Sequence, residues 1–309
     1  MTGAGALGLW SVPLAVLGGA IRVSTPFLFV SLGECITEKG GRINLGLEGT
    51  LMMGAMSGYA VSYLSGSPWL GVLAAGAVGI AMGLLHGTIC SLNRVNDIAV
   101  GIALMLFGVG LADYLGKPFI QPAAPQLPSI NFAWWSSSSE IQNALKINEL
   151  FLIGLVLTPF LSWAFRTTRW GLILRIVGES ADAARALGYP VIAVRIMATC
   201  AGGFLAGIGG SFLSLYYPGA WSERISSGQG ITAVALVIFA RWNPKLCFCA
   251  ALLFGGAGAL GPSLQSVGVH GGYYLFNAAP YILTLLIMIV TCSPKRALIG
   301  APAELSITK

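Results

Sequence analysis

The chain has 309 residues, of which 56% are apolar and 9% are charged, and its formal net charge is +6. A soluble domain carries roughly 25% charged residues, so this composition cannot surround a core of this size with a water-facing surface, and it excludes a water-soluble globular enzyme. The Lys and Arg residues form no cluster with interleaved aromatic residues, which argues against nucleic-acid binding.

Apolar runs separated by turns and charged segments account for most of the sequence. In chain order they cover 8–31, 43–64, 68–92, 98–116, 149–165, 196–217, 229–241, 246–263 and 276–292. In lipid the backbone of each run must satisfy its own hydrogen bonds, which favours helices. We therefore predict an all-α fold, a polytopic transmembrane helical bundle of about nine spans (eight to ten) that forms a single domain over 1–309.

Two of these segments are expected to be interrupted. The run 229–241 would be about 20 Å long as a helix, which is too short to cross a hydrocarbon core of roughly 30 Å. The segment GGRINLGLEG at 40–49 can be unwound at membrane depth. Interrupted segments in both halves of a chain are a pointer to a transport pathway.

The distribution of Lys and Arg predicts the orientation, because positive residues concentrate in cytoplasmic loops. With the charged loop 166–195 placed in the cytoplasm, three of the 17 Lys and Arg fall outside, one falls within a span and the remainder fall inside. The three outside are Lys117, Lys146 and Arg224, and the one within a span is Arg22. We therefore expect an external N-terminus, an external loop at 117–148 and a cytoplasmic C-terminus. The first ten residues lack a basic start, so no signal peptide is expected.

Polar and ionisable residues within spans are candidates for the solute pathway. Arg22 is expected to pair with Glu48, because Glu34 lies 12 residues further along the same helix and would be about 18 Å away. Amide and hydroxyl groups near the two interruptions suit a neutral, polyhydroxylated solute, although they can equally hold helices together. The pathway candidates are Arg22, Asn44, Gly46, Glu48, Ser226, Ser227, Gln229 and Thr232.

No catalytic or metal site is expected. His86 has no second ligand nearby, and Cys247 and Cys249 have neither the spacing nor the histidine of a zinc site. The sequence also contains no H-E-x-x-H or G-x-S-x-G motif, which argues against an intramembrane hydrolase.

The segment GESADAARALGYP at 178–190 is the most informative. Its alanines and spaced charges predict a short helix that ends at Gly188, with Pro190 just beyond. Glu179, Asp182 and Arg185 are three residues apart and are expected on one face of it. Such a helix can dock a partner or can simply link two spans, and the spacing leaves both possibilities open.

This segment resembles the cytoplasmic coupling-loop motif of ABC-importer permeases, with the pair Ala183 and Ala184 followed by Gly188. MATCAGGFLAGIGGSFLSL at 197–215 is similar to the Gly-rich helix that follows it in the branched-chain amino-acid, ribose and nucleoside (type II) permease family. Three further segments resemble the same family: TEKGGRINLGLEGTLMMGA at 37–55, SSGQGITAVALVIFARWNP at 226–244 and AALLFGGAGALGP at 250–262. The resemblance is in collinear order and covers nearly the whole chain. The nearest resemblance is to the nucleoside subgroup that works with basic-membrane-protein-type binding lipoproteins.

The resemblance implies a permease subunit of an ATP-binding-cassette importer in a bacterial inner membrane, moving a nucleoside, a purine or a simple sugar. It implies three partners: an ATPase subunit, a second permease chain (identical or different) and an extracytoplasmic solute-binding lipoprotein. No cofactor is expected in this chain, which has no G-x-x-x-x-G-K-[ST] loop, so ATP and Mg²⁺ would be held by the ATPase. The residues expected to contact the ATPase are Glu179, Asp182, Ala183, Ala184, Arg185 and Gly188.

A different class of function stays open at this point. The alternative is a self-sufficient secondary transporter or channel for a small polar solute, which would have no need of a docking helix at 166–195.

Overall fold

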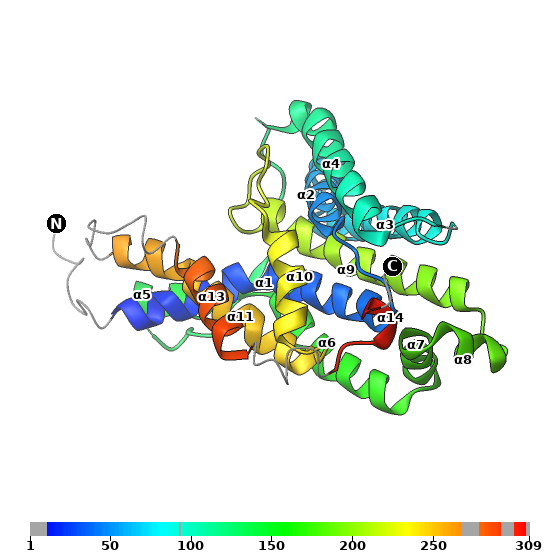
Figure 1. The fold of residues 1–309 in the computed structure, drawn as a ribbon. Helices are drawn as coiled ribbons and strands as arrows, with labels where there is room; N and C mark the ends of the chain where they lie inside the picture. Colours follow the sequence, from blue (N-terminus) through cyan, green and yellow to red (C-terminus); the bar gives the residue numbers. More distant parts are fainter. Residues whose placement is uncertain are drawn as a thin grey trace.

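The computed structural model describes residues 11–92, 94–120, 122–136, 138–266, 278–291 and 300–306, and long helices dominate it (Figure 1). The longer helices are α1 (Ser11–Lys39), α2 (Leu47–Ser65), α3 (Pro68–Ile89), α4 (Asp97–Gly116), α6 (Glu149–Thr167), α7 (Arg169–Glu179), α9 (Val191–Leu215), α10 (Gln229–Phe239), α11 (Pro244–Ser266) and α13 (Ala279–Thr291). The short elements are η2 (Lys117–Phe119), β1 (Ser129–Asn131), α5 (Ser139–Ala144), β2 (Lys146–Asn148), α8 (Ala181–Ala186) and α14 (Ala303–Ser306).

The predicted all-α transmembrane fold is confirmed, but the predicted number of spans is not. Six of the described helices are long and apolar enough to cross a membrane, namely α1, α3, α4, α6, α9 and α11. Each of the other apolar runs also contains a helix, but α10 has 11 residues and α13 has 13. At about 1.5 Å per residue, α10 and the described part of α13 are each shorter than a hydrocarbon core of roughly 30 Å.

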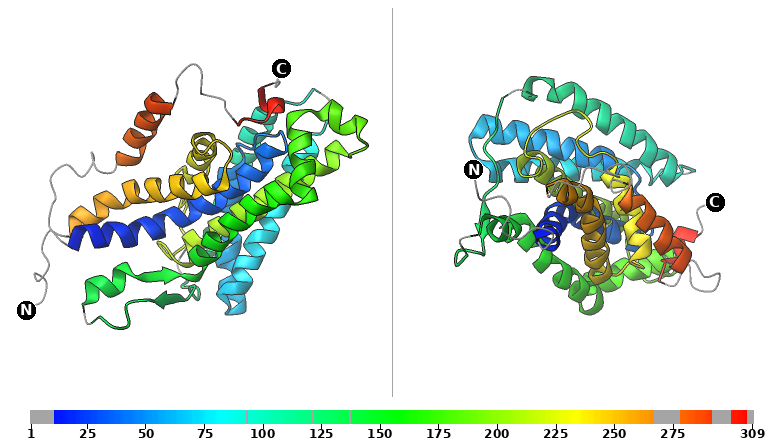
Figure 2. Two further views of the ribbon diagram at one scale, coloured as in Figure 1. Left: turned by 90° about the horizontal axis from the view of Figure 1, so that it is seen from below. Right: turned by 90° about the vertical axis from the view of Figure 1, so that its left-hand side faces the viewer.

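Helix α9 is the centre of the bundle. It packs against α1, α2 and α3, and α1 packs in turn along α11. Figure 2 shows the yellow-orange α11 running beside the blue α1. The second half of the chain therefore supplies the helix around which the helices of the first half assemble.

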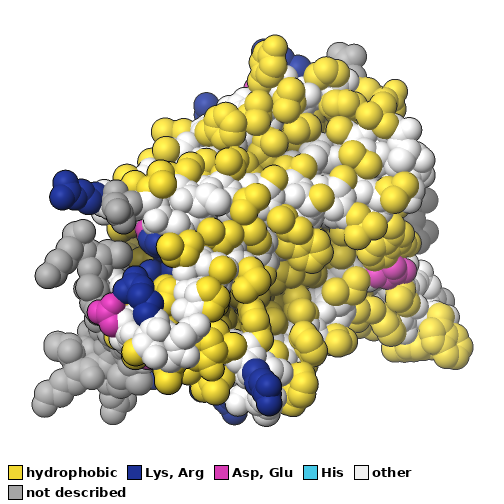
Figure 3. Space-filling model, turned by 90° about the vertical axis from the view of Figure 1, so that its right-hand side faces the viewer, with side chains coloured by type: hydrophobic (Ala, Val, Ile, Leu, Met, Phe, Trp, Pro, Cys, Tyr) yellow, Lys and Arg dark blue, Asp and Glu magenta, His cyan; other side chains and the backbone are white. Residues whose placement is uncertain are grey.

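The outer surface suits a lipid environment. Hydrophobic side chains cover most of the face drawn in Figure 3, and the charged side chains appear there in small groups. Large apolar side chains on several helices are exposed, for example Leu106 of α4 at 66% and Val156 of α6 at 68%. A contiguous apolar exterior of this kind marks a surface that water does not cover.

Several of the helices outside the long spans lie at the two ends of the bundle. Helices α7, α8 and α14 lie at one end and α5 lies at the other (Figure 1). Near α5, β1 and β2 pair antiparallel, with Ile130 opposite Ile147. The same loop is tied to α2, because the hydroxyl groups of Tyr59 and Ser62 donate to the carbonyl oxygens of Pro122 and Pro125, each at 2.8 Å.

Glycines allow α3 and α9 to approach closely. A Cβ added at Gly79 would lie 2.0 Å from the carbonyl oxygen of Gly203, and one added at Gly203 would lie 2.1 Å from the carbonyl oxygen of Gly79. Neither position can carry a side chain unless the two backbones separate. This is the small-residue packing by which helices associate in lipid, where no hydrophobic effect drives them together.

We predict that Gly79→Ala destabilises the protein by about 1–3 kcal/mol, because the methyl group forces the two helices apart. Thermal unfolding of the purified chain in detergent measures the effect. Gly110→Ala in α4 is the matched control, since a Cβ there meets nothing within 4 Å. An equal shift of the unfolding midpoint in both variants would show that the α3–α9 contact is not the tight one.

Candidate solute pathway and coupling region

The chain is unwound between α1 and α2, as predicted for part of 40–49: residues 40–46 are not helical. The side chain of Glu34, which is fully buried, accepts a hydrogen bond from the backbone N–H of Asn44 at 2.8 Å. Asn44 Oδ1 in turn accepts from the N–H of Gly46 at 2.9 Å. In lipid, an unwound backbone must find such partners inside the protein.

A second unwound stretch, 216–228, precedes the short helix α10. The carboxylate of Glu48, a residue that is 6% exposed, accepts from the N–H groups of Gly228 at 2.9 Å and Gly230 at 2.6 Å. The hydroxyl of Ser226 donates to the same carboxylate. Since Glu48 also lies in the first turn of α2, its negative charge lies at the N-terminal ends of two helices, where the helix dipoles favour it.

The absence of a side chain at Gly230 is what permits this contact. A Cβ there would lie 2.6 Å from the Cα of Glu48 and 2.7 Å from its Oε2. The two segments INLGLEG and SSGQG, from opposite halves of the chain, thus meet at one carboxylate. The sequence placed Glu48 and Ser226 among the pathway candidates, but it did not indicate that they bond to each other.

The predicted pairing of Arg22 with Glu48 is wrong. The guanidinium Nη2 of Arg22 donates instead to the backbone carbonyl oxygen of Asn143 in α5. Both oxygens of Glu48 already accept hydrogen bonds from the start of α10, so Glu48 has no need of a cation. Arg22 therefore fastens α1 to the loop at the α5 end and is not part of the Glu48 cluster.

The remaining pathway candidates lie on or beside α10. Ser227 is exposed, and its hydroxyl donates to the carbonyl oxygen of Arg224 at 3.4 Å. Thr232 is half-buried and its hydroxyl donates to the carbonyl oxygen of Gly228 at 3.0 Å. Gln229 is half-buried, and its Oε1 has no hydrogen-bond partner among the described residues. The start of α10 thus presents neutral hydroxyl and amide groups next to a carboxylate whose own bonds are already made.

The short helix predicted before Gly188 is present as α8 (Ala181–Ala186), but the expectation that Glu179 lies on it is wrong. Helix α7 ends at Glu179, and α8 begins at Ala181. Ser180 between them has extended backbone angles (φ −157°, ψ 111°), and its hydroxyl caps α8 by accepting from the N–H of Ala183 at 3.1 Å. The N-cap hydroxyl thus starts a new helix, so Glu179 does not share a helical face with Asp182 and Arg185.

Most of the expected coupling residues are nevertheless at the surface. Asp182 and Arg185 form an exposed ion pair of 2.6 Å, Ala183 is exposed, and Ala184 is fully buried. Gly188 has φ +81°, and a Cβ there would meet nothing within 4 Å. The preceding Leu187 is 63% exposed. The tip of this loop therefore projects an apolar side chain and an open glycine away from the bundle.

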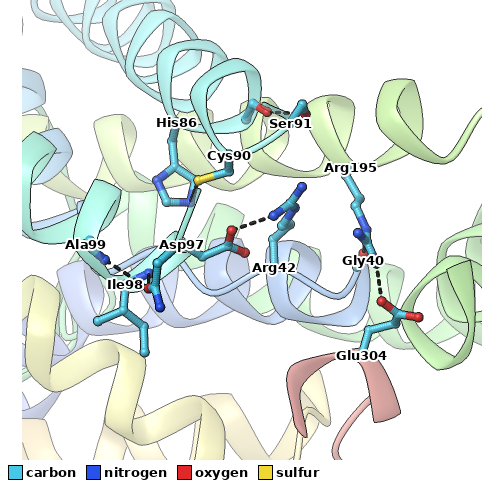
Figure 4. A network of polar contacts seen from close by, with 12 residues as sticks. Gly40, Arg42, His86, Cys90, Ser91, Asp97, Ile98, Ala99, Arg195 and Glu304 are labelled. Atoms are coloured by element: carbon cyan, nitrogen blue, oxygen red, sulfur yellow. Dashed lines mark hydrogen bonds and ion pairs between the residues drawn. The ribbon is translucent and has the colours of Figure 1, made fainter. Parts of the chain in front are cut away.

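A contact that the sequence did not predict holds α8 in place. Oε1 of Glu304 in α14 accepts from the N–H of Ala181 at 2.8 Å, and its Oε2 pairs with Nη2 of Arg195 at 2.9 Å. Arg195 also donates from Nε to the carbonyl oxygen of Gly40 at 3.2 Å (Figure 4). The starts of α8 and α9, the end of α1 and the C-terminal α14 are thus joined through one carboxylate.

A neighbouring ion pair joins the stretch after α1 to the first residue of α4, beside the end of α3. Arg42 and Asp97 form an ion pair of 2.5 Å, and Nε2 of the fully buried His86 lies 3.6 Å from Sγ of Cys90 (Figure 4). Burial, with a smaller contribution from Asp97, raises the pKa of the Cys90 thiol to about 12, so the thiol stays neutral. His86 therefore contacts a neutral thiol beside an ion pair, which is the packed arrangement expected of a buried histidine.

Comparison with known proteins identifies the family. The family described as "Branched-chain amino acid transport system / permease component" matches residues 15–292, most of the chain. This chain belongs to that family. It is a multi-pass membrane permease subunit of an ATP-binding-cassette importer.

Individual relatives agree with this assignment. The permease is 31% identical over 266 residues to the "Putative glucose ABC transporter permease protein TsgC13" of Haloferax volcanii, covering 84% of this chain and 80% of the relative. It is 29% identical to the "Nucleoside ABC transporter permease protein NupC" of Lactococcus lactis subsp. cremoris, covering 88% and 90% of the two chains. It is 28% identical to the "Guanosine ABC transporter permease protein NupQ" of Bacillus subtilis, again covering 88% and 90%.

We predict that Glu48→Gln destabilises the permease by about 2 kcal/mol, because hydrogen bonds to a charged acceptor are worth about 1.5–3 kcal/mol and the new amide places an NH₂ against a backbone N–H. The thermal unfolding midpoint should fall by about 5 °C. Glu223→Gln, in the exposed part of the same loop, is the control and should leave the midpoint unchanged. Equal midpoints for both variants would contradict the bridging role of Glu48.

We further predict that Glu304→Gln lowers the unfolding midpoint by several degrees and raises hydrogen exchange in α8. The reason is that Arg195 and Glu304 are only 11% and 19% exposed, so their pair is little screened by solvent. Asp182→Asn is the comparison: the side chains of its pair are 93% and 62% exposed, and such pairs contribute little. A larger fall in the unfolding midpoint for Asp182→Asn than for Glu304→Gln would contradict the role of Glu304 in holding α8.

Proposed function

We propose that this permease imports a small polar solute, a nucleoside, purine or simple sugar, using ATP that a separate subunit hydrolyses. The observation that carries the proposal is the loop tip at Leu187 and Gly188, which projects from the bundle while Glu304 holds its helix to the ends of α1 and α9. An exposed apolar loop tip beside a helix that is held in place by hydrogen bonds suits a docking site for the ATPase subunit. A carrier that works alone has no need of one.

The proposed coupling runs through the contacts already described. A shift of α8 would reach Gly40 through Glu304 and Arg195, and Gly40 begins the unwound stretch that Glu34 holds. From there Glu48 would pass the movement to α10. Interrupted helices with two discrete arrangements are the kind of element that converts a small displacement into a change of access.

The neutral groups at the start of α10 support the proposed class of solute. Ser227, Gln229 and Thr232 offer hydroxyl and amide groups, which can bind sugar hydroxyls weakly enough for release. Glu48 would contribute by positioning these residues, because its carboxylate is already bonded. The relatives named for glucose, nucleosides and guanosine agree with a sugar-bearing solute.

The same proposal includes the partners and the orientation. The ATPase would hold ATP and Mg²⁺, a second permease chain, identical or different, would complete the pathway, and a binding lipoprotein would deliver the solute. The end with α7, α8 and α14 would face the cytoplasm, with the N-terminus outside, since the loop 166–195 carries five of the arginines and no lysine. The loop 117–148 would then be external.

The permease assembled with its ATPase in proteoliposomes tests this function. We expect ATP-dependent accumulation of a labelled nucleoside or sugar, and no accumulation by the permease alone. Uphill accumulation by the permease alone would support the secondary-transporter alternative and contradict the proposal.

We predict that Gly188→Trp abolishes both uptake and co-purification with the ATPase, while the chain still inserts into the membrane. The indole would occupy the open space at the docking face. Gly188→Asn is the control, because Asn tolerates the positive φ of this position and adds little volume. Uptake that survives Gly188→Trp, or that is lost equally in Gly188→Asn, would contradict docking at this loop.

A further inference from the structure

A basic pocket opens at the α7 end of the bundle. It has a volume of about 230 Å³ and lies between the ends of α1 and α6, the helix α7 and the turn that joins α10 to α11. Ser162, Trp242 and Asn243 contribute polar groups to its wall. The charged residues that line it are all cationic, namely Lys39, Arg166, Arg175 and Arg241.

Within the described part of the chain, none of these four cations forms an ion pair with a carboxylate. The ion pairs among the described residues are Arg42–Asp97, Arg185–Asp182 and Arg195–Glu304, and none involves the pocket. The remaining sequence, outside the described residues, contains no Asp or Glu at all. The pocket therefore concentrates positive charge that an external anion would neutralise.

The carboxylate next to Lys39 in the sequence is already engaged. Glu38 precedes Lys39 but is 2% exposed, and it accepts a hydrogen bond from the indole N–H of Trp242 behind the pocket wall. Lys39 itself lies 5.9 Å from the centre of the Phe165 ring. Arg241 and Trp242 have φ values of 49° and 53°, a left-handed conformation that non-glycine residues rarely adopt. The turn is thus held in an uncommon shape that places Arg241 at the pocket.

The pocket lies where three of the candidate membrane spans begin or end, the level at which lipid headgroups are expected. Lys39 is the last residue of the span in α1, Arg166 lies in the last turn of the span in α6, and Pro244 begins the span in α11. Basic pockets between the ends of spanning helices bind anionic headgroups, and each nearby Lys or Arg contributes about 1 kcal/mol to the attraction.

A row of exposed apolar side chains runs along α6 from the pocket. Its members are spaced three or four residues apart, so they share one face of the helix, and all are about half exposed or more. They are Ile153 (47%), Val156 (68%), Phe160 (55%) and Trp163 (55%). This face ends next to Arg166, which matches the layout of a phospholipid, with a phosphate at one end and acyl chains beyond it.

We propose that this pocket binds the phosphate group of an anionic phospholipid from the adjacent leaflet, with the acyl chains along the exposed face of α6. The lipid would fasten the ends of α1, α6 and α10 to one another at the level where α7 begins. The proposal does not depend on which solute is carried or on how the ATPase docks.

The test is lipid binding to the full chain, delipidated in neutral detergent and titrated with phosphatidylglycerol or with phosphatidylcholine, using native mass spectrometry as the readout. We expect phosphatidylglycerol to bind and phosphatidylcholine to bind at least tenfold more weakly. Arg175→Gln/Arg241→Gln should weaken phosphatidylglycerol binding about thirtyfold, which corresponds to about 2 kcal/mol for two cations.

Matched variants control for nonspecific charge effects and for misfolding. Arg94→Gln/Arg169→Gln removes the same charge from exposed positions outside the pocket and should leave binding unchanged. Arg175→Lys/Arg241→Lys should retain most of it, which separates loss of charge from misfolding. Equal weakening by both Gln pairs would mean general electrostatic attraction and would overturn the site.

Inorganic phosphate distinguishes the source of the anion. If the pocket is a lipid site, millimolar phosphate should displace little phosphatidylglycerol, because it lacks the acyl chains that the α6 face would hold. Full displacement would assign the pocket to free phosphate and overturn the lipid proposal. Loss of ATPase binding with unchanged lipid binding in Arg175→Gln/Arg241→Gln would likewise overturn it, in favour of an acidic segment of the partner.

Discussion

An unwound backbone inside a membrane must have its hydrogen bonds satisfied by the protein, and two buried carboxylates meet this requirement here. Glu34 accepts from the stretch between α1 and α2, and Glu48 accepts from the start of α10. Without these acceptors, the N–H groups of Asn44, Gly228 and Gly230 would face an apolar interior at a cost of several kcal/mol each. The interrupted helices, and with them the polar face of α10, can therefore exist only because the acids are present.

The same interactions join parts of the chain that are distant in sequence. Glu48 connects the first turn of α2 to the first turn of α10, and Glu304 connects α14 to the starts of α8 and α9. The close glycine contacts of α3 and α9 form a tightly packed centre of the bundle. In the proposed coupling, these polar connections would let the end bearing α8 move together with the interrupted helices around the packed centre.

The sequence was sufficient for the fold class, because a polytopic helical bundle follows from apolar runs and a shortage of charge. It also placed the interruption before α2, at GGRINLGLEG, and the short α10, whose apolar run is too short to cross the membrane as a helix. It did not give the pairing of Arg22, because helical spacing shows what one helix can reach and not which helix lies beside it. The contacts of Glu304 were missed for the same reason, because its partners Ala181 and Arg195 are more than 100 residues away in the sequence. The break at Ser180 carried a signal, an N-cap serine, that the alanine-rich pattern around it concealed.

The bond between Glu48 and the start of α10 can be tested most directly by hydrogen exchange at residue resolution. The account predicts that the amides of Gly228 and Gly230 are protected in the native permease and exchange at least tenfold faster in Glu48→Gln, while the amides in the middle of α3 and α9 keep their protection. Unchanged protection at these two glycines would contradict the claim that this carboxylate holds the interrupted helix in place.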